Sequence, residues 1–267
     1  MEKICLSNLG MIVTNKCNLN CEHCMRGCKN NKVMSEEVIK ATLDQINFIN
    51  NLCICGGEPT LAVDTMYNIL DYAIKNNILI GGFSTTINGS IYSKDFLDLL
   101  KYAGEYARKV DFDVSYDQYH IKELNRLTLY KQFMENLKKY AESEYFVGIR
   151  VSPNVKLFRE GNAEQLDGNL TIDYRPLPIY VTYVGKKKKL DLLNGKCFVG
   201  PVMTVNTDGI ITECDASIEH QQTIYNYGNV LNDSIEDVAI ERGKILKYSK
   251  WTRECKKSVK NYLTYNE

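Results

Sequence analysis

Two apolar patterns alternate along the first part of the chain. Short apolar runs predict strands at residues 11–14, 52–55, 79–83, 110–114, 147–151 and 171–174. Apolar residues at helical spacing predict helices between them, at 36–49 after a capping Ser35, and at 66–74, 96–103 and 121–140. Strands and helices that alternate at these separations favour right-handed βαβ units and an α/β fold with a parallel sheet.

The pattern changes beyond Gly185. A run of four lysines at 186–189 is most simply a solvated turn between two strands. Residues 197–214 then predict a hairpin whose turn is Asn206-Thr207-Asp208-Gly209, and a helix is predicted to begin near Ser234. We therefore divide the chain into a core at residues 1–185 and a small α+β extension at residues 186–267.

Three cysteines follow the first predicted strand, at the spacing Cys17-x3-Cys21-x2-Cys24. A tight loop with this spacing can bring three thiolates to one soft metal centre, whereas a closed site normally uses four protein ligands. A cube held by three thiolates leaves one iron open to a substrate or cofactor. Alternatively, Cys28 completes a four-thiolate zinc or electron-transfer site, and the protein is then a non-enzymatic module.

A second motif, Cys55-Gly56-Gly57-Glu58-Pro59, ends the second predicted strand. Together, the two motifs resemble those of the radical S-adenosylmethionine (radical SAM) superfamily, over about residues 10–185 and most sharply over 11–60. The resemblance implies a partial (β/α)6 TIM-like barrel. It also implies that Cys17, Cys21 and Cys24 hold a [4Fe–4S] cluster whose open iron is chelated by the amino and carboxylate groups of S-adenosylmethionine.

The resemblance also assigns roles to polar residues at the strand ends, where parallel barrels carry their chemistry. Gly56 and Gly57 would approach the methionine end of S-adenosylmethionine, and Glu58 would accept a hydrogen bond from its ammonium group. The other cofactor-binding candidates are Asn88, Ser115 and Asp117, of which the last two would contact the ribose, and Arg150, which would pair with the carboxylate. Ordinary turn and strand-end roles are the alternative for these four.

One further residue of the cysteine loop, His23, precedes the third cysteine. Many members of the superfamily have an aromatic residue there that lies against the adenine. His23 could stack in the same way, or it could be a solvent-facing loop histidine. We do not predict it as a metal ligand, and the sequence identifies no catalytic side chain.

The extension resembles the opening of the SPASM and twitch domains, which hold auxiliary [4Fe–4S] clusters. Cys197, Cys214 and Cys255 are the candidate ligands here. The dense central cysteine block of a full SPASM domain is missing, so the extension is truncated. The three cysteines could hold a second cluster, or they could pack as small hydrophobic residues.

Composition narrows the class of protein. Hydrophobic residues make up 44% of the 267 residues, and Lys+Arg balance Asp+Glu at 33 each. The balanced charge disfavours a nucleic-acid partner or an anionic membrane surface. The N-terminus does not resemble a signal peptide, and no apolar run reaches transmembrane length. Ten cysteines are then better explained as metal or redox thiols than as disulfides, so we expect a cytoplasmic protein.

The function implied by the resemblance is reductive cleavage of S-adenosylmethionine to a 5′-deoxyadenosyl radical, which removes a hydrogen atom from a peptide or small-molecule substrate. Such an oxidoreductase-like enzyme needs a one-electron donor, for example flavodoxin or ferredoxin. An activase that installs a glycyl radical on a partner protein is an alternative within the enzyme class. The four-cysteine module is the alternative outside it.

Overall fold

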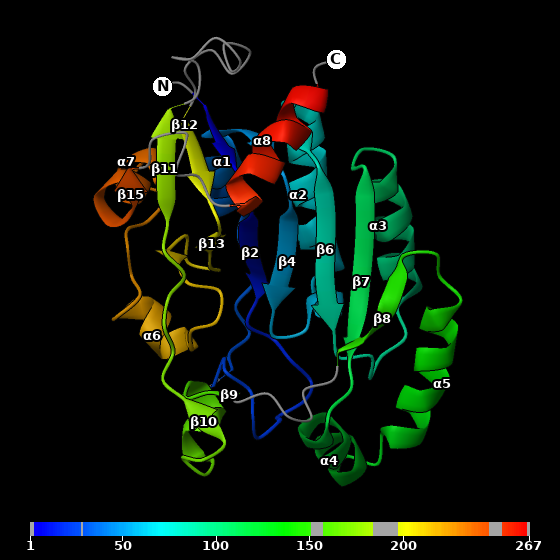
Figure 1. The fold of residues 1–267 in the computed structure, drawn as a ribbon. Coiled ribbons are helices and arrows are strands. Elements are labelled where there is room, and N and C mark those ends of the chain that lie inside the picture. The colour runs from blue at the N-terminus through cyan, green and yellow to red at the C-terminus, as the bar shows by residue number, and fades with distance from the viewer. Residues whose placement is uncertain (1–2, 28, 151–156, 184–196, 246–252, 266–267) are drawn as a thin grey trace.

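The computed structural model describes residues 3–27, 29–150, 157–183, 197–245 and 253–265 (Figure 1). Its larger sheet has seven strands. Neighbouring strands in this sheet are parallel, except for β13 and β14, which are antiparallel. The order is β14 (Ile211–Thr212), β13 (Met203–Val205), β2 (Leu9–Thr14), β4 (Leu52–Gly56), β6 (Gly82–Ile87), β7 (Lys109–Ser115) and β8 (Phe146–Arg150). The predicted α/β fold with parallel strands is confirmed.

A second sheet has six strands, and four of them come directly before a strand of the larger sheet along the chain. Its order is β15 (Lys244–Ile245), β11 (Tyr180–Tyr183), β12 (Cys197–Gly200), β1 (Ile4–Leu6), β3 (Ile46–Ile49) and β5 (Leu79–Ile80). One or two residues separate β1 from β2, β3 from β4, β5 from β6 and β12 from β13. At these breaks side-chain amides replace ladder bonds, as where Asn8 donates to the Pro201 carbonyl at 2.6 Å and Asn50 to the Ser7 carbonyl at 3.3 Å.

Helices between the strands cover the outer face of the larger sheet (Figure 1). They are α1 (Glu36–Leu43), α2 (Val63–Lys75), α3 (Lys94–Gly104) and α5 (Tyr130–Ala141), whereas α4 (Gln118–Arg126) lies beyond the ends of the strands. Ser35 caps α1 as predicted, since its side chain accepts a hydrogen bond from the Val38 backbone. The apolar stripes of these helices pack on buried strand residues such as Leu52 and Ile54 in one core.

The C-terminal quarter adds strands to both sheets. β13 lies parallel to β2 and forms a hairpin with β14, and the turn has Gly209 in the left-handed conformation at φ +80°, so the predicted hairpin is confirmed. The helix α7 (Ile235–Arg242) begins after Ser234 as predicted, and a short α6 (Ile218–Gln222) precedes it. The predicted boundary near residue 185, like the lysine run, lies outside the described residues and stays a prediction.

Three expectations for single elements were wrong. Helix α1 ends at Leu43, and Ile46–Ile49 forms β3, because this segment pairs with β1 and β5 on its two sides. The segment 121–140 is two helices, since Thr128 takes a left-handed φ of +59° between α4 and α5. The expected sixth barrel strand, β10 (Thr171–Ile172), pairs with β9 (Leu157–Phe158) in a separate two-stranded sheet.

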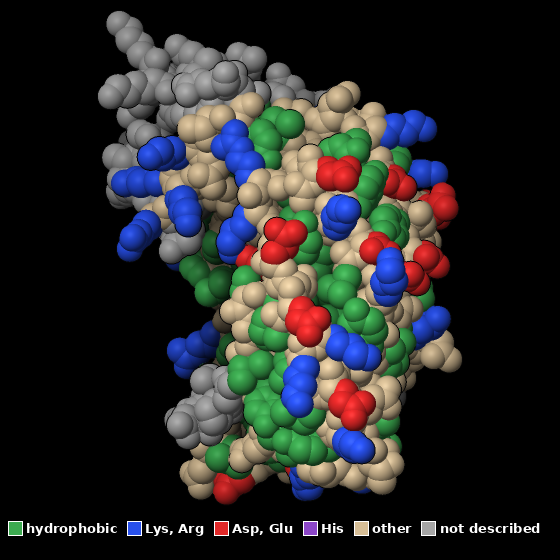
Figure 2. Space-filling model, turned by 90° about the vertical axis from the view of Figure 1, so that its right-hand side faces the viewer, with side chains coloured by type: hydrophobic (Ala, Val, Ile, Leu, Met, Phe, Trp, Pro, Cys, Tyr) green, Lys and Arg blue, Asp and Glu red, His purple; other side chains and the backbone are tan. Residues whose placement is uncertain are grey.

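The last helix, α8 (Arg253–Tyr265), lies at the end of the molecule where the strands begin (Figure 1). Tyr262 packs edge-on against Phe48 with ring centroids 5.0 Å apart, in a small core that is separate from the main one. The face in Figure 2 shows acidic and basic side chains interspersed over most of its area, in keeping with the balanced charge. None of the described helices has the length and apolar content needed to cross a membrane.

Candidate functional site

The cysteine loop leaves the C-terminal end of β2 and folds back on itself. The Cys24 N–H donates to the Cys21 carbonyl at 3.1 Å, and the Leu19 N–H points to the Cys17 sulfur at 3.5 Å. Cys21 is buried, whereas Cys17 and Cys24 are partly exposed. The loop therefore carries all three predicted ligands at one end of the sheet. Cys28 lies outside the described residues.

The chemistry of these thiols fits a metal centre. Burial raises the pKa of Cys21 far above its usual range, and the neighbouring Cys24 and Cys17 raise it further. Burial also raises the pKa of Cys17. Thiols that disfavour one another's ionisation become thiolates when a bound cation supplies opposite charge. The donor set thus fits a cationic cluster.

The Gly56-Gly57 turn lies directly against the start of the cysteine loop. The Gly57 N–H donates to the Thr14 carbonyl at 2.7 Å, and the Glu58 N–H donates to the Lys16 carbonyl at 2.7 Å. A Cβ atom on Gly57 would lie 2.2 Å from the Lys16 carbonyl oxygen. Only glycine permits this approach, so the turn and the loop hold one another in place.

Glu58 is buried and connects this turn to the end of β6. One carboxylate oxygen accepts hydrogen bonds from the Thr60 amide at 3.2 Å and hydroxyl at 2.6 Å, and the other accepts from the Asn88 amide at 2.7 Å. Burial raises the pKa of Glu58. The Asn88 side chain in turn donates to Asn18 at 2.9 Å and lies 3.8 Å from the Cys17 sulfur. Glu58 and Asn88 thus link the turn to the cysteine loop.

Asp117 is brought to the other side of the same loop. It caps α4, accepting hydrogen bonds from the Tyr119 and His120 amides at 2.9 Å each, and its second oxygen lies 3.3 Å from Nε2 of His23. Burial opposes its ionisation, but the hydrogen bonds from His120 and His23 outweigh burial and hold the pKa of Asp117 far below its usual range. His23 also stacks on Tyr119, with ring centroids 4.9 Å apart. The sequence did not show this contact.

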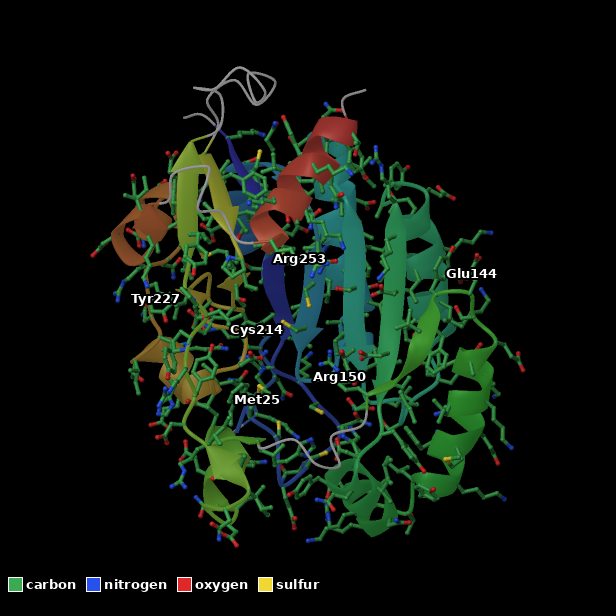
Figure 3. The ribbon with its side chains drawn as sticks, in the orientation of Figure 1. Met25, Glu144, Arg150, Cys214, Tyr227 and Arg253 are labelled. Carbon is green, nitrogen blue, oxygen red and sulfur yellow. The ribbon has the colours of Figure 1, made fainter. Side chains whose placement is uncertain are left out.

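Ser115 and Arg150 lie side by side where β7 and β8 end. The Arg150 side chain is largely exposed, at 63%, and its Nε lies 3.3 Å from an Asp113 carboxylate oxygen. The structure therefore brings Arg150 to the predicted end of the sheet (Figure 3), but it is paired with a neighbouring carboxylate there.

Two of the auxiliary-cluster candidates, Cys197 and Cys214, have different neighbours in the described part of the chain. Cys197 is buried on β12, beside Cys5 of β1, where Glu236 also lies close. Cys214 instead lies against β4, with its sulfur 3.7 Å from that of Cys55. The side chain of Cys255, on α8, lies outside the described side chains. The described side chains give no support to a cluster shared by Cys197 and Cys214.

A second group of thiols lies on the inner face of the sheet, away from the helices. On β4, Leu52 and Ile54 are fully buried while Cys53 and Cys55 are partly exposed, so the two cysteines face the opposite side from the helices. The Cys55 hydrogen bond, helped by the Arg26 guanidinium, outweighs burial and lowers the pKa of Cys214 to about 7. Burial raises the pKa of Cys53 to about 11.

Cysteines in an apolar strand are commonly small buried core residues, but Cys53 and Cys55 are partly exposed here. They alternate with the buried Leu52 and Ile54, so they lie on the opposite face of β4. The neighbouring strands place Ser84 and Asp111 on the same level of this inner face. The inner face is therefore polar, unlike the face that the helices cover.

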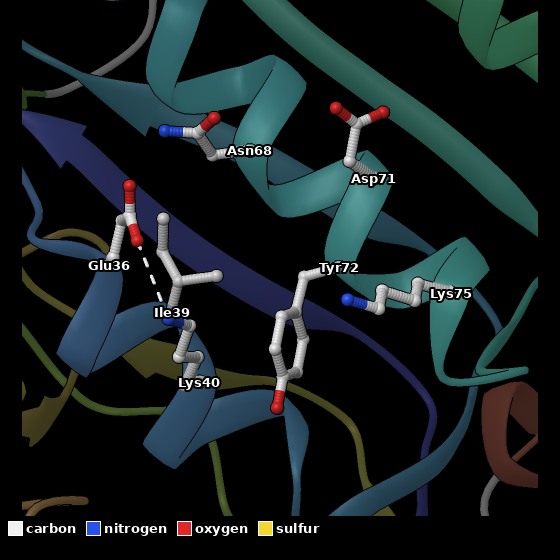
Figure 4. A pocket seen from close by; sticks show the side chains of 7 residues that line it. All are labelled: Glu36, Ile39, Lys40, Asn68, Asp71, Tyr72 and Lys75. Carbon is white, nitrogen blue, oxygen red and sulfur yellow. Dashed lines mark hydrogen bonds and ion pairs between the residues drawn. The ribbon is translucent and has the colours of Figure 1, made fainter.

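Two cavities lie elsewhere on the described surface. One, of about 180 Å³, lies between α1 and α2 (Figure 4), where Lys40 pairs with Glu36 at 3.4 Å and Tyr72 bonds to Asp44 at 2.6 Å. This cavity is on the side of the molecule that the helices cover. The other, of about 370 Å³, adjoins the cysteine loop and is lined by Arg26, Lys29, Asn162, Glu164, Glu219 and Gln222 among others.

Comparison with known proteins gives three findings. The family model described as the radical SAM superfamily matches residues 11–160. An uncharacterized protein of Methanocaldococcus jannaschii is 36% identical over 74 residues, which are 27% of this chain and 26% of that protein. The chain is thus matched to about a quarter of that relative's length.

Solved structures are also similar. The structure of native anSMEcpe with bound AdoMet and Cp18Cys peptide is 15% identical with a TM-score of 0.52, covering 97% of this chain and 96% of that one. Streptococcus suis SuiB bound to S-adenosylmethionine is 15% identical with a TM-score of 0.47, covering 88% of this chain and 65% of that one. The first of these likenesses shows a shared fold.

Proposed function

Because the chain belongs to the radical SAM superfamily, we propose that it is an enzyme that cleaves S-adenosylmethionine and abstracts hydrogen from a peptide or small molecule. In this superfamily a [4Fe–4S] cluster supplies one electron to S-adenosylmethionine, and the 5′-deoxyadenosyl radical that results removes the hydrogen atom. The observation that carries the proposal is the hydrogen-bonded contact between the Gly56-Gly57-Glu58 turn and the cysteine loop. The turn and the loop contain the two sequence motifs that resemble those of the family.

In this proposal Cys17, Cys21 and Cys24 hold the cluster. The Leu19 amide and the Asn88 side-chain amide lie near the Cys17 sulfur. Donors near a thiolate sulfur stabilise its negative charge and tune the potential of the cluster. These two groups therefore make Cys17 a better ligand without binding metal themselves.

The strand-end residues would bind and orient S-adenosylmethionine. Gly56, Gly57 and Glu58 lie beside the loop and would contact the methionine end of S-adenosylmethionine. The Asn88 backbone amide donates to Glu58 and its side chain lies near Cys17, so Asn88 fixes the turn relative to that cysteine. Ser115 and Asp117 would receive the ribose. Arg150 would have to release Asp113 in order to pair with the carboxylate. Orientation of this kind is the main task of the protein, because the cofactors supply the bond-breaking chemistry.

A peptide is the substrate class that the comparison favours, since anSMEcpe was solved with a bound peptide and shares the fold. The polar inner face, with Cys53, Ser84 and Asp111, is where we expect such a substrate to lie. A flavodoxin or ferredoxin would donate the electron in the cytoplasm, which suits ten reduced cysteines. We propose a single cluster, because Cys197 and Cys214 lie against different strands.

The proposal is tested anaerobically on protein reconstituted with iron and sulfide. With S-adenosylmethionine and dithionite, we expect 5′-deoxyadenosine and methionine in equal amounts, and about four irons per chain. Cys21→Ala should abolish both cleavage and iron binding. Cys28→Ala is the matched control in the same loop, and it should retain both.

Two results would contradict this proposal. Loss of metal in Cys28→Ala together with no cleavage by the wild type would indicate a closed four-thiolate site. About eight irons per chain would indicate a second cluster, and the single-cluster part of the proposal would then be wrong.

A further inference from the structure

Two cysteines from distant parts of the chain have neighbouring sulfur atoms. Cys55 is the last residue but one of β4, and Cys214 follows β14, 159 residues later. Their Sγ atoms are 3.7 Å apart, and the Cys55 thiol also lies 3.7 Å from the Met11 carbonyl oxygen. A disulfide bond needs its sulfurs at about 2.05 Å, so the two sulfurs would have to approach one another to form it.

A buried cation lies beside this pair. Arg26 is only 8% exposed, and one guanidinium nitrogen lies 3.8 Å from the Cys214 sulfur while another donates to the Ala216 carbonyl at 3.2 Å. These two partners are a backbone carbonyl and a sulfur atom, and neither is a carboxylate. A buried guanidinium requires a negative partner, and the Cys214 thiolate is in position to be one. The same charge would repel a metal cation, so the pair is better suited to thiol chemistry than to metal binding.

We propose that Cys55 and Cys214 form a reversible dithiol–disulfide pair that exchanges with a small disulfide such as oxidised glutathione. Both residues are partly exposed on the polar inner face. Figure 3 shows Cys214 near the C-terminal ends of β2 and β4. The pair lies beside the cysteine loop, to which Arg26 belongs, but it uses none of the three proposed cluster ligands and does not require the proposed function.

The exchange proceeds in two balanced steps. The Cys214 thiolate attacks one sulfur of glutathione disulfide, which forms a mixed disulfide and releases one glutathione as thiolate. The Cys55 thiol then gives its proton to that thiolate, and its sulfur attacks the Cys214 sulfur, which releases the second glutathione as thiolate. The protein pair loses two electrons, and one glutathione disulfide is reduced to two glutathiones.

The bond would connect two parts of the molecule that contact one another without a covalent link. It joins the segment after β14 to the strand that ends in the Gly56-Gly57 turn. Oxidation would therefore hold the C-terminal segment against the inner face and restrict access to it. A cross-link that closes so long a loop should also raise the unfolding temperature.

The test uses the full-length, iron-loaded protein under anaerobic conditions. The protein is equilibrated with buffers of varied reduced-to-oxidised glutathione ratio, its free thiols are alkylated, and its peptides are analysed by mass spectrometry. We expect a peptide pair joined through Cys55 and Cys214, with a defined midpoint that is the same from both directions. Cys55→Ser should instead trap glutathione on Cys214, and Cys214→Ser should abolish the cross-link.

Cys53→Ser is the matched control, because it removes a thiol from the same face of the same strand, and it should leave the midpoint unchanged. A cross-link through Cys53, or no cross-link at any ratio while the iron content is intact, would overturn the proposal. The readout does not involve S-adenosylmethionine. A protein that forms the disulfide but cleaves no S-adenosylmethionine would sustain this inference and contradict only the proposed enzyme function.

Discussion

Individual polar residues hold the candidate site together by contacts that reach across the sheet edge. Asp117 is an example, because it satisfies the N-terminus of α4 and at the same time fixes His23 in the cysteine loop. A carboxylate in this position is stabilised in its charged form by donors on both sides. Its contribution to stability should therefore depend on pH.

Asp117→Asn is expected to lower the unfolding free energy of the metal-free protein by about 2 kcal/mol at pH 7, the range for hydrogen bonds to a charged group. The pKa of Asp117 is lowered in the folded protein. The stability it contributes is therefore present above its unfolded pKa and is lost as the pH falls through its folded pKa. Urea unfolding of both proteins between pH 7 and pH 3 should show the difference shrinking below about pH 4.

The control for this experiment is Asp64→Asn, which changes an exposed aspartate in the first turn of α2. Its effect on the unfolding free energy should be small throughout this pH range. A wild-type advantage over Asp117→Asn that grows on acidification would show that the hydrogen bonds from His23 and His120 do not stabilise the carboxylate.

Elements meet at two kinds of tight junction. At the first, the turn after β4 passes so close to the segment after β2 that only glycine fits. This junction joins the two motifs on which the family assignment rests. The second is the break between α4 and α5, where Thr128 is left-handed and the Leu129 amide donates to the Leu124 carbonyl at 2.7 Å, as in a Schellman cap.

Gly57→Ala should separate the turn from the cysteine loop, because its Cβ would lie 2.2 Å from a backbone oxygen that belongs to the loop. We expect a loss of more than about 2 kcal/mol in unfolding free energy and less iron per chain after reconstitution. Gly168→Ala is the control, since its Cβ would meet only the end of the flexible Arg159 side chain. Normal iron content in Gly57→Ala would show that the loop does not depend on this junction.

Thr128→Gly should stabilise the protein, because a β-branched residue at a φ of +59° carries strain that glycine does not. A gain of about 1 kcal/mol in urea unfolding is expected, after the entropy that glycine adds to the unfolded chain. Thr223→Gly tests the specificity, since Thr223 has an ordinary φ of −120° at the end of α6, and it should give no gain.

The molecule as a whole has two unlike ends. The cysteine loop and the Gly56-Gly57 turn lie where the strands of the larger sheet end, and α8 covers the end where strands begin (Figure 1). In parallel barrels the first end carries chemistry and the second carries stability. Substitutions at the two ends should therefore have separable effects.

Tyr262→Ala should lower the unfolding free energy by about 3 kcal/mol, because it removes a buried ring that packs on Phe48. Below its lower unfolding temperature the variant should still bind wild-type amounts of iron, since α8 is remote from the cysteine loop. Tyr106→Ala, which truncates an exposed ring, should cost much less. Loss of iron in folded Tyr262→Ala would mean that the two ends are coupled.

Much of the fold was predictable because its signals are local. The apolar runs and helical stripes predicted five of the strands in the larger sheet, and the Gly209 turn predicted the C-terminal hairpin. The errors arose where tertiary contacts decided, as at Ile46–Ile49, whose apolar residues fit a helical stripe but pair with two neighbouring strands. The left-handed position after α4 is occupied by Thr128 and not by glycine, so the sequence contains no signal for the end of this helix.

The sequence alone determined the family, the parallel α/β fold and the position of the cysteine loop after β2, because spacing within a motif and periodicity within an element are properties of neighbouring residues. Only the tertiary structure decided which distant residues meet. It brought Asp117 to His23 and Cys214 to Cys55, and it placed Cys197 beside Cys5. Such contacts depend on strand order, register and the face on which each side chain emerges, and these are set by the packing of the whole chain.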